Sequence, residues 1–305
     1  MYRPKVSIGV PVYNGENFIG EAIESFLSQS FDDFELIISD NASIDSTEAI
    51  CKYYQTRDGR IKYSRNSKNL GAARNYNKVF TLSSGKYFKW AAHDDICHQR
   101  FLECCVNTLD KDDSVVLAYT EYNYINEEGD EILSRKRSVA DFSSEVVWKR
   151  FRGLIGENGF APIFGLIRSE VLMKTPLLGS FPMHDYILLA DLSLYGKFYC
   201  IPDLLFSLRR HPSCFGKAVW NPHRPGDSVA WFDTLKSGSV SLPYWRRTYE
   251  HFSSCTKAEL TFLERFLCFM IITNWAANHG KELAKDLAFA LYNMLGIMKK
   301  VSKIE

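Results

Sequence analysis

The sequence predicts an α/β fold in which helices flank a mainly parallel, mixed sheet, with a helical extension at the C-terminus. Short β-rich runs alternate with helical patterns over about the first 125 residues. Hydrophobic residues make up 46% of the 305 residues and charged residues 24%, proportions typical of a globular protein with a large core. From residue 244 to residue 300 the pattern is almost entirely helical.

The first elements along the chain form a β-α-β unit. Val6–Val12 is a run of β-forming residues, and apolar residues then recur at helical spacing between Phe18 and Leu27. Phe34–Ser39 is a second apolar strand, and the serines and aspartates that follow it signal a helix over Thr47–Tyr54. Strands separated by helices in this way predict parallel pairing.

The same alternation continues to residue 122. The next elements are a strand at Ile61–Ser64, a helix at Leu70–Leu82, a strand at Tyr87–Ala92, a helix at Gln99–Leu109 and a strand at Val115–Tyr122. A turn at residues 126–130 ends the alternation, and we expect residues 135–160 to form a mobile connection because they are rich in charge and glycine.

The later elements are less regular. We expect a strand at Ile163–Ile167, helices at Ser169–Lys174 and Asp185–Tyr195, and a strand at Leu204–Arg210. Three prolines mark residues 212–228 as a loop. The chain therefore divides into a domain over residues 1–240, with halves at 1–125 and 126–240, and a helical subdomain over residues 241–305.

The charge balance excludes a nucleic-acid-binding surface. Lys and Arg number 37 and Asp and Glu 36, so the net charge is only +1 and any anion must be held by a local site. The eight cysteines follow no regular spacing, which favours reduced thiols over a zinc site or disulfides. Neither a signal peptide nor a membrane-spanning run is visible, so we expect a cytoplasmic protein, with attachment to the inner face of the membrane as the alternative.

Polar residues follow the first four predicted strands at the point where each strand ends. They are residues 11–14, Asp40 with Asn41, residues 65–74, and Asp94 with Asp95. In parallel α/β sheets ligands bind at this edge, so these residues are expected to converge on one crevice. Adjacent carboxylates suit a divalent cation that also touches phosphate, although a helix cap or a solvated turn explains Asp94 equally well.

These segments resemble the family 2 inverting glycosyltransferases of the GT-A fold. The resemblance rests on Val6–Val12 with Tyr13-Asn14, on Glu35–Asp45, on Asn69–Asn75, and on Tyr87–Asp95 with its terminal pair of aspartates. It is specific over residues 4–125 and extends more weakly to about residue 212. It implies a GT-A fold and a nucleotide-sugar donor, and UDP is the nucleotide we expect.

The resemblance assigns a set of residues to the nucleotide: Pro11, Tyr13, Asp40, Asn41, Arg65, Arg74 and His93. Pro11 and Tyr13 would contact the base, Asp40 its imide edge or the ribose, and Arg74 the base or the diphosphate. The alternatives are structural: loop shaping for Pro11 and Tyr13, a helix cap for Asp40, and a surface ion pair for Arg74.

The resemblance also implies a Mn²⁺ or Mg²⁺ ion, with Asp94, Asp95 and His211 as its candidate ligands. The family commonly has a further aspartate where this chain has Ala92, which puts the ribose contact of that residue in doubt. A structural histidine is the alternative for His211.

Asp185 occupies the place of the family's catalytic base, and Asp191 on the same predicted helix is the second candidate. A carboxylate at a helix N-terminus tends to stay ionised, as a base must be, although an N-cap at Asp185 is the structural alternative. A single base predicts direct displacement with inversion, in which the acceptor is a hydroxyl of a glycan or a lipid-linked glycan.

Two other functions remain open. A nucleotidyltransferase also uses a doubly wound sheet and a divalent ion, but residues 11–16 lack its glycine-rich phosphate loop. A non-catalytic carbohydrate- or protein-binding module on a decayed site would explain Ala92, but not the presence of Asp40, Asp94 and Asp185.

The C-terminal helices carry more apolar residues than one helix face can hold. Packing into the core is the main expectation, and contact with a membrane surface or a homodimer is the alternative. The lysines that could border such a surface are Lys281, Lys285, Lys299, Lys300 and Lys303.

Overall fold

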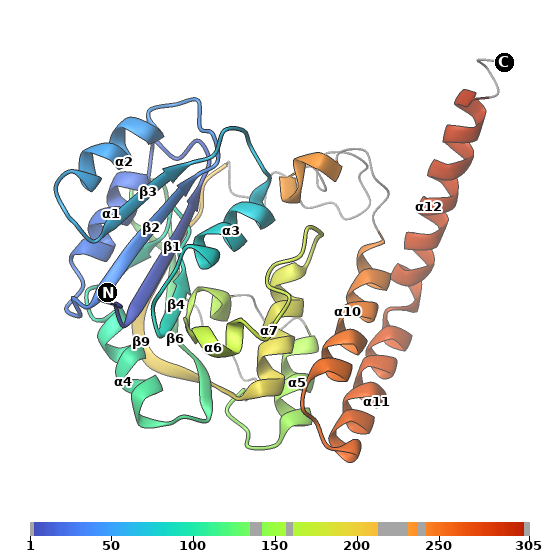
Figure 1. Cartoon of the computed structure of the whole chain (residues 1–305). Coiled ribbons are helices and arrows are strands. Elements are labelled where there is room, and N and C mark those ends of the chain that lie inside the picture. The colour runs from blue at the N-terminus through green and yellow to red at the C-terminus, as the bar shows by residue number, and fades with distance from the viewer. Residues whose placement is uncertain (1–2, 135–141, 157–160, 213–230, 237–241, 302–305) are drawn as a thin grey trace.

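The computed structural model describes residues 3–134, 142–156, 161–212, 231–236 and 242–301. A nine-stranded mixed sheet runs through the centre of the molecule (Figure 1). Its order is β3 (Ile61–Arg65), β2 (Phe34–Asp40), β1 (Val6–Val12), β4 (Tyr87–Trp90), β8 (Leu166–Arg168), β6 (Val115–Ile125), β9 (Lys197–Arg209) and β5 (Ile96–Cys97), with β7 (Glu131–Ser134) paired to β6.

The sheet contains two parallel blocks. Strands β3, β2, β1 and β4 are parallel to one another, and β6 is parallel to β9. The antiparallel strand β8 joins the blocks by pairing with both β4 and β6. The α/β class with a mainly parallel, mixed sheet is therefore confirmed.

Two hydrophobic cores lie on opposite faces of the sheet. One packs under α1 (Ile19–Leu27), α2 (Thr47–Gln55) and α4 (Phe101–Lys111). The other packs under α3 (Ala72–Thr81), α5 (Val147–Ile155), α6 (Ser169–Leu172) and α7 (His184–Tyr195). All seven residues of β1 and of β2 are buried because helices cover both faces, which explains their almost continuous apolar sequences.

Gly9 in the middle of β1 allows α3 to lie close to the sheet. A β-carbon at this position would stand 2.6 Å from the Cγ2 atom of Val79 and 2.8 Å from the ring of Phe88. Both distances are far inside van der Waals contact, so a larger residue would push α3 outward.

The structure corrects two sequence expectations about local structure. The segment expected to be a mobile connection contains α5, which the hydrophobic pattern hides because Arg150 is buried in it and donates from Nε to the carbonyl oxygen of Ser193 at 2.9 Å. The strand expected at residues 163–167 is a 3₁₀ turn, η1 (Ala161–Phe164), followed by β8.

The strand expected at residues 204–210 begins earlier, because β9 starts at Lys197. Pro202 and Asp203 fall in a bulge, where the pairing with β6 jumps from Ile201 to Leu204. A proline is tolerated at a bulge although it reads as a strand terminator in the sequence. Most of the loop expected at residues 212–228 lies outside the described residues.

Three helices form the C-terminal part: α10 (Pro243–Lys257), α11 (Phe262–Asn278) and α12 (Gly280–Val301). Asp286 of α12 is fully buried, and its Oδ2 atom accepts hydrogen bonds from the backbone nitrogens of Tyr244 (2.8 Å) and Trp245 (3.3 Å) at the start of α10. The distal part of α12 extends away from the body (Figure 1). Among the described residues no helix combines the length and apolar character needed to cross a membrane.

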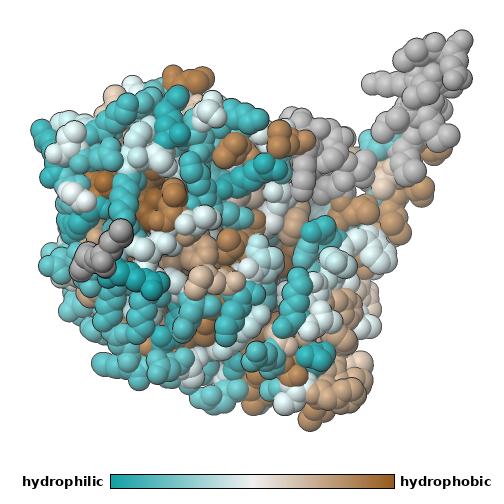
Figure 2. All heavy atoms as spheres, viewed as in Figure 1, coloured by the Kyte–Doolittle hydropathy of each residue, from teal (hydrophilic) through white to brown (hydrophobic). Residues whose placement is uncertain are grey.

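The apolar residues of these helices divide between core and surface. Cys268, Ile272 and Trp275 of α11 are buried, so part of the set packs as expected. The exposed members are Phe262, Leu263, Phe266 and Met270 on α11, and Leu287, Leu291, Tyr292 and Leu295 on α12. Figure 2 shows hydrophobic residues gathered on the side of the molecule where Figure 1 places these helices. The side chains of Lys299, Lys300 and Lys303 lie outside the described set.

Candidate active site

The ends of three parallel strands lie side by side at one edge of the sheet. In the register of the sheet Val12 of β1 pairs with Asp40 of β2, and Asp40 pairs with Arg65 of β3. The backbone nitrogen of Asn41 then donates to the carbonyl oxygen of Val12 at 2.8 Å, which holds the first two loops together. The polar residues that follow the strands therefore converge, as the sequence predicts.

Asp40 organises this edge from inside the protein. Its carboxylate is fully buried and accepts hydrogen bonds from the backbone nitrogen of Ser43 and from the hydroxyl of Tyr63, both at 2.8 Å. Arg65 adds an ion pair at 3.4 Å to Asp40 and one at 3.2 Å to Glu48. The side chain of Asp40 is thus committed to shaping the loop after β2, which leaves the partly exposed Arg65 as the charged group at the surface.

Asn41 is also held by neighbouring loops. Its Oδ1 atom accepts from the amide of Asn66 at 3.0 Å and from the backbone of Leu70 at 2.9 Å, and its Nδ2 atom donates to Asn69 at 2.8 Å. These bonds fix the segment that contains Gly71 and Arg74. Asn41 is buried, so its direct contribution is to the position of that segment.

Tyr13 and His93 present rings at the same edge. The side chain of Tyr13 is 42% exposed, while Pro11 before it is buried within β1. The ring of His93 packs against Gly15, where an added β-carbon would stand 2.7 Å from its Cδ2 atom. Tyr13 is therefore open to a ligand, whereas Pro11 shapes the strand end.

Arg74 lies at the start of α3 and faces a segment distant in sequence. Its Nη2 atom is 3.3 Å from Oδ2 of Asp233, whose own exposure is 1%. Gly71, with a φ of 86°, allows the chain around Asp233 to pack closely against the start of α3. A β-carbon at this position would stand 2.6 Å from the carbonyl oxygen of Phe232. Asp233 precedes the short 3₁₀ turn η2 (Thr234–Lys236), and no sequence motif marks it as the partner of Arg74.

The loop after β4 contains a carboxylate–histidine pair. The Nε2 atom of His211 is 2.9 Å from the Oδ2 atom of Asp94. Burial raises the pKa of Asp94, but the hydrogen bond to His211 and the charges of His93 and His211 outweigh burial and leave the pKa below its usual value. Asp94 is thus held as a carboxylate at the edge of the sheet.

Asp95 faces a different environment. It is buried, and its Oδ1 atom accepts the backbone N–H of Arg209 at 3.0 Å. Burial and the adjacent charge of Asp94 raise the pKa of Asp95 well above its usual value. Arg209 also donates from Nε to the backbone oxygen of Asp94 at 2.8 Å and pairs with Glu21 at 2.5 Å, so it fixes the whole loop against the end of β9.

The Asp94–His211 pair fits a divalent cation better than the Asp94–Asp95 pair does. Within the described ranges no group of three or more histidine, cysteine or carboxylate side chains is arranged around a metal position. Mg²⁺ and similar ions are commonly held by one or two protein ligands together with substrate phosphates and water. The donor set of Asp94 and His211 meets that requirement, while Asp95 is committed to Arg209.

Asp185 is the second residue of α7, and the N-cap position belongs to Met183, so the N-cap alternative for Asp185 is wrong. Burial first, and then the charges of Asp94, Asp95 and Asp185, raise the pKa of Tyr76 on α3. Tyr76 therefore stands within electrostatic reach of both the strand-end carboxylates and Asp185. The candidate base Asp185 and the candidate cation ligand Asp94 therefore both lie near one tyrosine.

Asp191 does not join this group. It is 3% exposed and hydrogen-bonds Ser254 of α10. Burial raises its pKa to about 7. The second candidate for the base is thus placed in the interface between α7 and α10.

Sequence reasoning did not single out Tyr63, Tyr76 or Asp233. Arg209 is the first residue of Arg209-Arg210-His211, which resembles the family's late Arg-x-His element, but the sequence suggests a role only for His211. Tyr76 follows the Asn69–Asn75 motif directly. Tyr63 and Asp233 can be identified as part of the site only from the structure, through the hydrogen bond of Tyr63 to Asp40 and the ion pair of Asp233 with Arg74.

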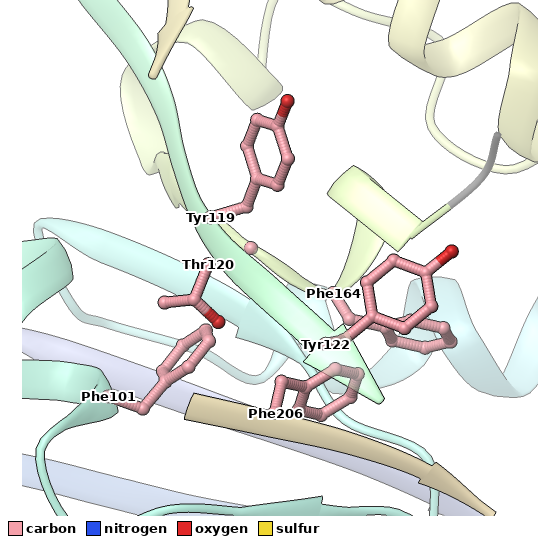
Figure 3. Close-up of a pocket in the computed structure, with 7 residues that line it drawn as sticks. Phe101, Tyr119, Thr120, Tyr122, Phe164 and Phe206 are labelled. Atoms are coloured by element: carbon pink, nitrogen blue, oxygen red, sulfur yellow. The ribbon is translucent and has the colours of Figure 1, made fainter. Parts of the chain in front are cut away.

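A small cavity lies elsewhere, between β6, β9, α4 and η1 (Figure 3). It is lined by Phe101, Tyr119, Thr120, Tyr122, Phe164, Gly165 and Phe206, and its volume is about 10 Å³. That volume is at the lower limit for one water molecule, so this cavity does not hold a nucleotide.

Comparisons with known proteins show the family of this chain. The sequence profile of glycosyl transferase family 2 matches residues 7–173. The uncharacterized glycosyltransferase RT0329 of Rickettsia typhi is 36% identical over 127 residues, which cover 41% of this chain and 39% of that protein. Glycosyltransferase GlyG of Streptococcus pneumoniae is 25% identical over 247 residues, which cover 77% of this chain and 80% of that protein. The chain thus spans about two fifths of the length of RT0329 and most of GlyG.

Solved structures show the same fold. The crystal structure of Staphylococcus aureus TarS 1–349 in complex with UDP aligns with a TM-score of 0.63 at 15% identity, covering 90% of this chain and 71% of that one. The mannosyltransferase PcManGT from Pyrobaculum calidifontis, in complex with GDP-Man and Mn²⁺, aligns with a TM-score of 0.54 at 14% identity, covering 100% of this chain and 81% of that one. The fold is GT-A like, and this chain belongs to glycosyl transferase family 2.

Proposed function

We propose that this enzyme transfers a sugar from a nucleotide diphosphate donor, most simply a UDP-sugar, to a hydroxyl of a glycan or lipid-linked glycan, with inversion at the anomeric carbon. The observation that carries the proposal is the position of Asp185 and of the Asp94–His211 pair around Tyr76. A displacement needs a base on one side of the reacting carbon and a stabilised leaving group on the other.

The donor nucleotide is assigned to the edge formed by β1, β2 and β3. Tyr13 offers an exposed ring for the base, and Arg65, Arg74 and His93 border the same edge with positive or neutral polar groups. Asp40 and Asn41 act through the loops that they hold. Structural neighbours of this chain bind UDP, UDP-GlcNAc and GDP-Man, which supports a nucleotide sugar without deciding the base or the sugar.

Asp94 and His211 would hold Mn²⁺ or Mg²⁺ together with oxygens of the diphosphate. Bound there, the ion supplies positive charge that offsets the charge developing on the leaving group. Asp185 accepts the proton of the acceptor hydroxyl as that oxygen attacks the anomeric carbon. The residues next to Asp185 in the sequence, His184 and Tyr186, offer no second carboxylate, which supports one displacement and hence inversion.

The decisive experiment measures nucleotide release from a panel of UDP- and GDP-sugars in the presence of acceptor glycans, with and without a chelator. We expect release from at least one donor and its loss on chelation. If no nucleotide is released from any donor but nucleotide still binds in a metal-dependent way, a non-catalytic binding module is favoured instead. Release of pyrophosphate from a nucleoside triphosphate would favour a nucleotidyltransferase.

Two variants on α7 then test the base. Asp185→Asn is expected to lower kcat by about 10²- to 10⁴-fold with donor affinity retained, because only proton transfer is lost. Asp191→Asn is the matched control on the same helix and is expected to keep kcat within about threefold. Loss of turnover in Asp191→Asn with activity retained in Asp185→Asn would overturn the assignment.

A further inference from the structure

Tyr76 of α3 lies next to the carboxyl end of β4. Phe80, one helical turn later in α3, packs edge-on against Phe88 at 4.9 Å between ring centroids and against Trp90 at 6.4 Å. Since α3 runs back from the carboxyl edge of the sheet, a residue one turn earlier than Phe80 overlies the chain beyond Trp90. The indole nitrogen of Trp90 donates to the backbone oxygen of Tyr76 at 2.9 Å and fixes this position.

The other side of α3 is tied to the segment that leads into α7. The amide of Asn77 donates to the carbonyl oxygen of Leu178 at 2.8 Å and accepts from the backbone nitrogen of Leu178 at 3.1 Å. The backbone of Tyr76 thus contacts the strand that leads into the loop of Asp94, while the next residue is bonded to the segment that leads to Asp185, and both carboxylates lie near its side chain. Its side chain is partly buried against the hydrophobic core under α3, and among the described residues its hydroxyl has no hydrogen-bond partner.

The inference from the position of Tyr76 rests on the proposed function. In a direct displacement the anomeric carbon lies between the leaving phosphate oxygen, near Asp94, and the attacking oxygen, near Asp185. The transferred sugar must then occupy the space beside Tyr76. Its phenol stays protonated, because burial first, and then the charges of the surrounding carboxylates, raise its pKa.

We propose that Tyr76 binds the transferred sugar, donates its phenolic hydrogen to a sugar hydroxyl, and so takes part in selecting the sugar. A site that hydrogen-bonds a substrate hydroxyl discriminates against a sugar in which that hydroxyl is missing or inverted. A single neutral hydrogen bond corresponds to a change of roughly 3- to 10-fold.

The test compares wild type with Tyr76→Phe for UDP-glucose and UDP-galactose, which differ in the configuration of one hydroxyl, and measures UDP affinity by calorimetry with Mn²⁺. We expect kcat/KM for the preferred donor to fall roughly 3- to 10-fold, the preference between the two donors to narrow, and the Kd for UDP to change less than twofold. Unchanged UDP affinity also reports that the variant is folded.

Tyr54→Phe is the matched control, because the hydroxyl of Tyr54 bonds Glu24 at 2.6 Å between α1 and α2, away from the site. It should keep both kcat/KM and donor preference. An unchanged preference and kcat/KM in Tyr76→Phe, with an active wild type, would overturn this inference alone. Absence of nucleotide release from every donor by the wild type would instead overturn the proposed function, and the role of Tyr76 with it.

Discussion

The Nε2 atom of His211 lies 2.9 Å from the Oδ2 atom of Asp94, across 117 positions of sequence. Arg209, two residues before His211, supports this contact, because it donates hydrogen bonds to the backbone oxygen of Asp94 and to the carboxylate of Asp95. The end of β9 is thereby fixed to the loop after β4. This junction makes the two adjacent aspartates unequal, since Asp94 is partly buried and paired with a histidine side chain, whereas Asp95 is buried and bonded to backbone.

Substitution of the two aspartates should therefore have different effects. Asp94→Asn removes the carboxylate that faces the cation position, and we expect nucleotide release to fall by about 100-fold or more. Asp95→Asn keeps an acceptor for the backbone N–H of Arg209 and replaces a group that already favours its neutral form, so the fall should be under about 10-fold. Steady-state assays over a Mn²⁺ titration check both, and equal losses would contradict the assignment.

Gly71→Ala should destabilise the protein. The residue has a φ of 86°, and the added methyl would meet the backbone of Phe232 at 2.6 Å, so we expect a loss of about 1 to 3 kcal/mol in the free energy of unfolding. Gly59→Ala is the control, because nothing lies within 4 Å of its added methyl, and its effect should stay within about 0.5 kcal/mol. Urea unfolding measures both, and matching midpoints would contradict the contact.

Asp191 should make stability depend on pH. Burial raises its pKa from 3.8 to about 7, so between these values the unfolded chain has lost the proton that the native protein retains. The free energy of unfolding then falls as pH rises from about 4 to 7, by up to about 4 kcal/mol from this group, and is unaffected by it outside that window.

The amide in Asp191→Asn cannot ionise, so the variant should lack this fall. Its stability relative to wild type is expected to increase between pH 5 and pH 8, as measured by urea unfolding at four pH values. Parallel pH profiles for the two proteins would show that Asp191 keeps an ordinary pKa in the native state.

Two residues of α11 should differ sharply in their contribution to stability. Ile272 is fully buried against the body, and Ile272→Ala should cost about 2 to 5 kcal/mol through lost burial and the cavity left behind. Met270 is 55% exposed, and Met270→Ala should change the free energy of unfolding by less than about 0.5 kcal/mol. Thermal and urea unfolding check this, and a large cost at Met270 would mean that the exposed face is covered.

The parallel strands at the N-terminus could be predicted from the sequence almost residue by residue. Val6–Val12 is β1 as expected, and β2 ends one residue later than expected, at Asp40. Strands buried on both faces give unbroken apolar runs, which are the plainest pattern a sequence offers. The helix α5 was missed for the opposite reason, because its buried Arg150 satisfies its guanidinium through backbone oxygens that no local pattern announces.

The sequence by itself determined the fold class, the edge of the sheet where polar residues gather, and, through the motifs at residues 6–14, 35–45 and 69–75, the family. Only the tertiary structure decided what each polar residue does there. Asp40 and Asn41 turn inward because Tyr63 and Leu70 supply their partners, while the partly buried carboxylate of Asp94 pairs with His211 and that of Asp95 with the backbone of Arg209. Local patterns record which residues are apolar, but the partner of a buried polar group comes from a strand or loop far along the chain, and that partner sets its charge and its direction.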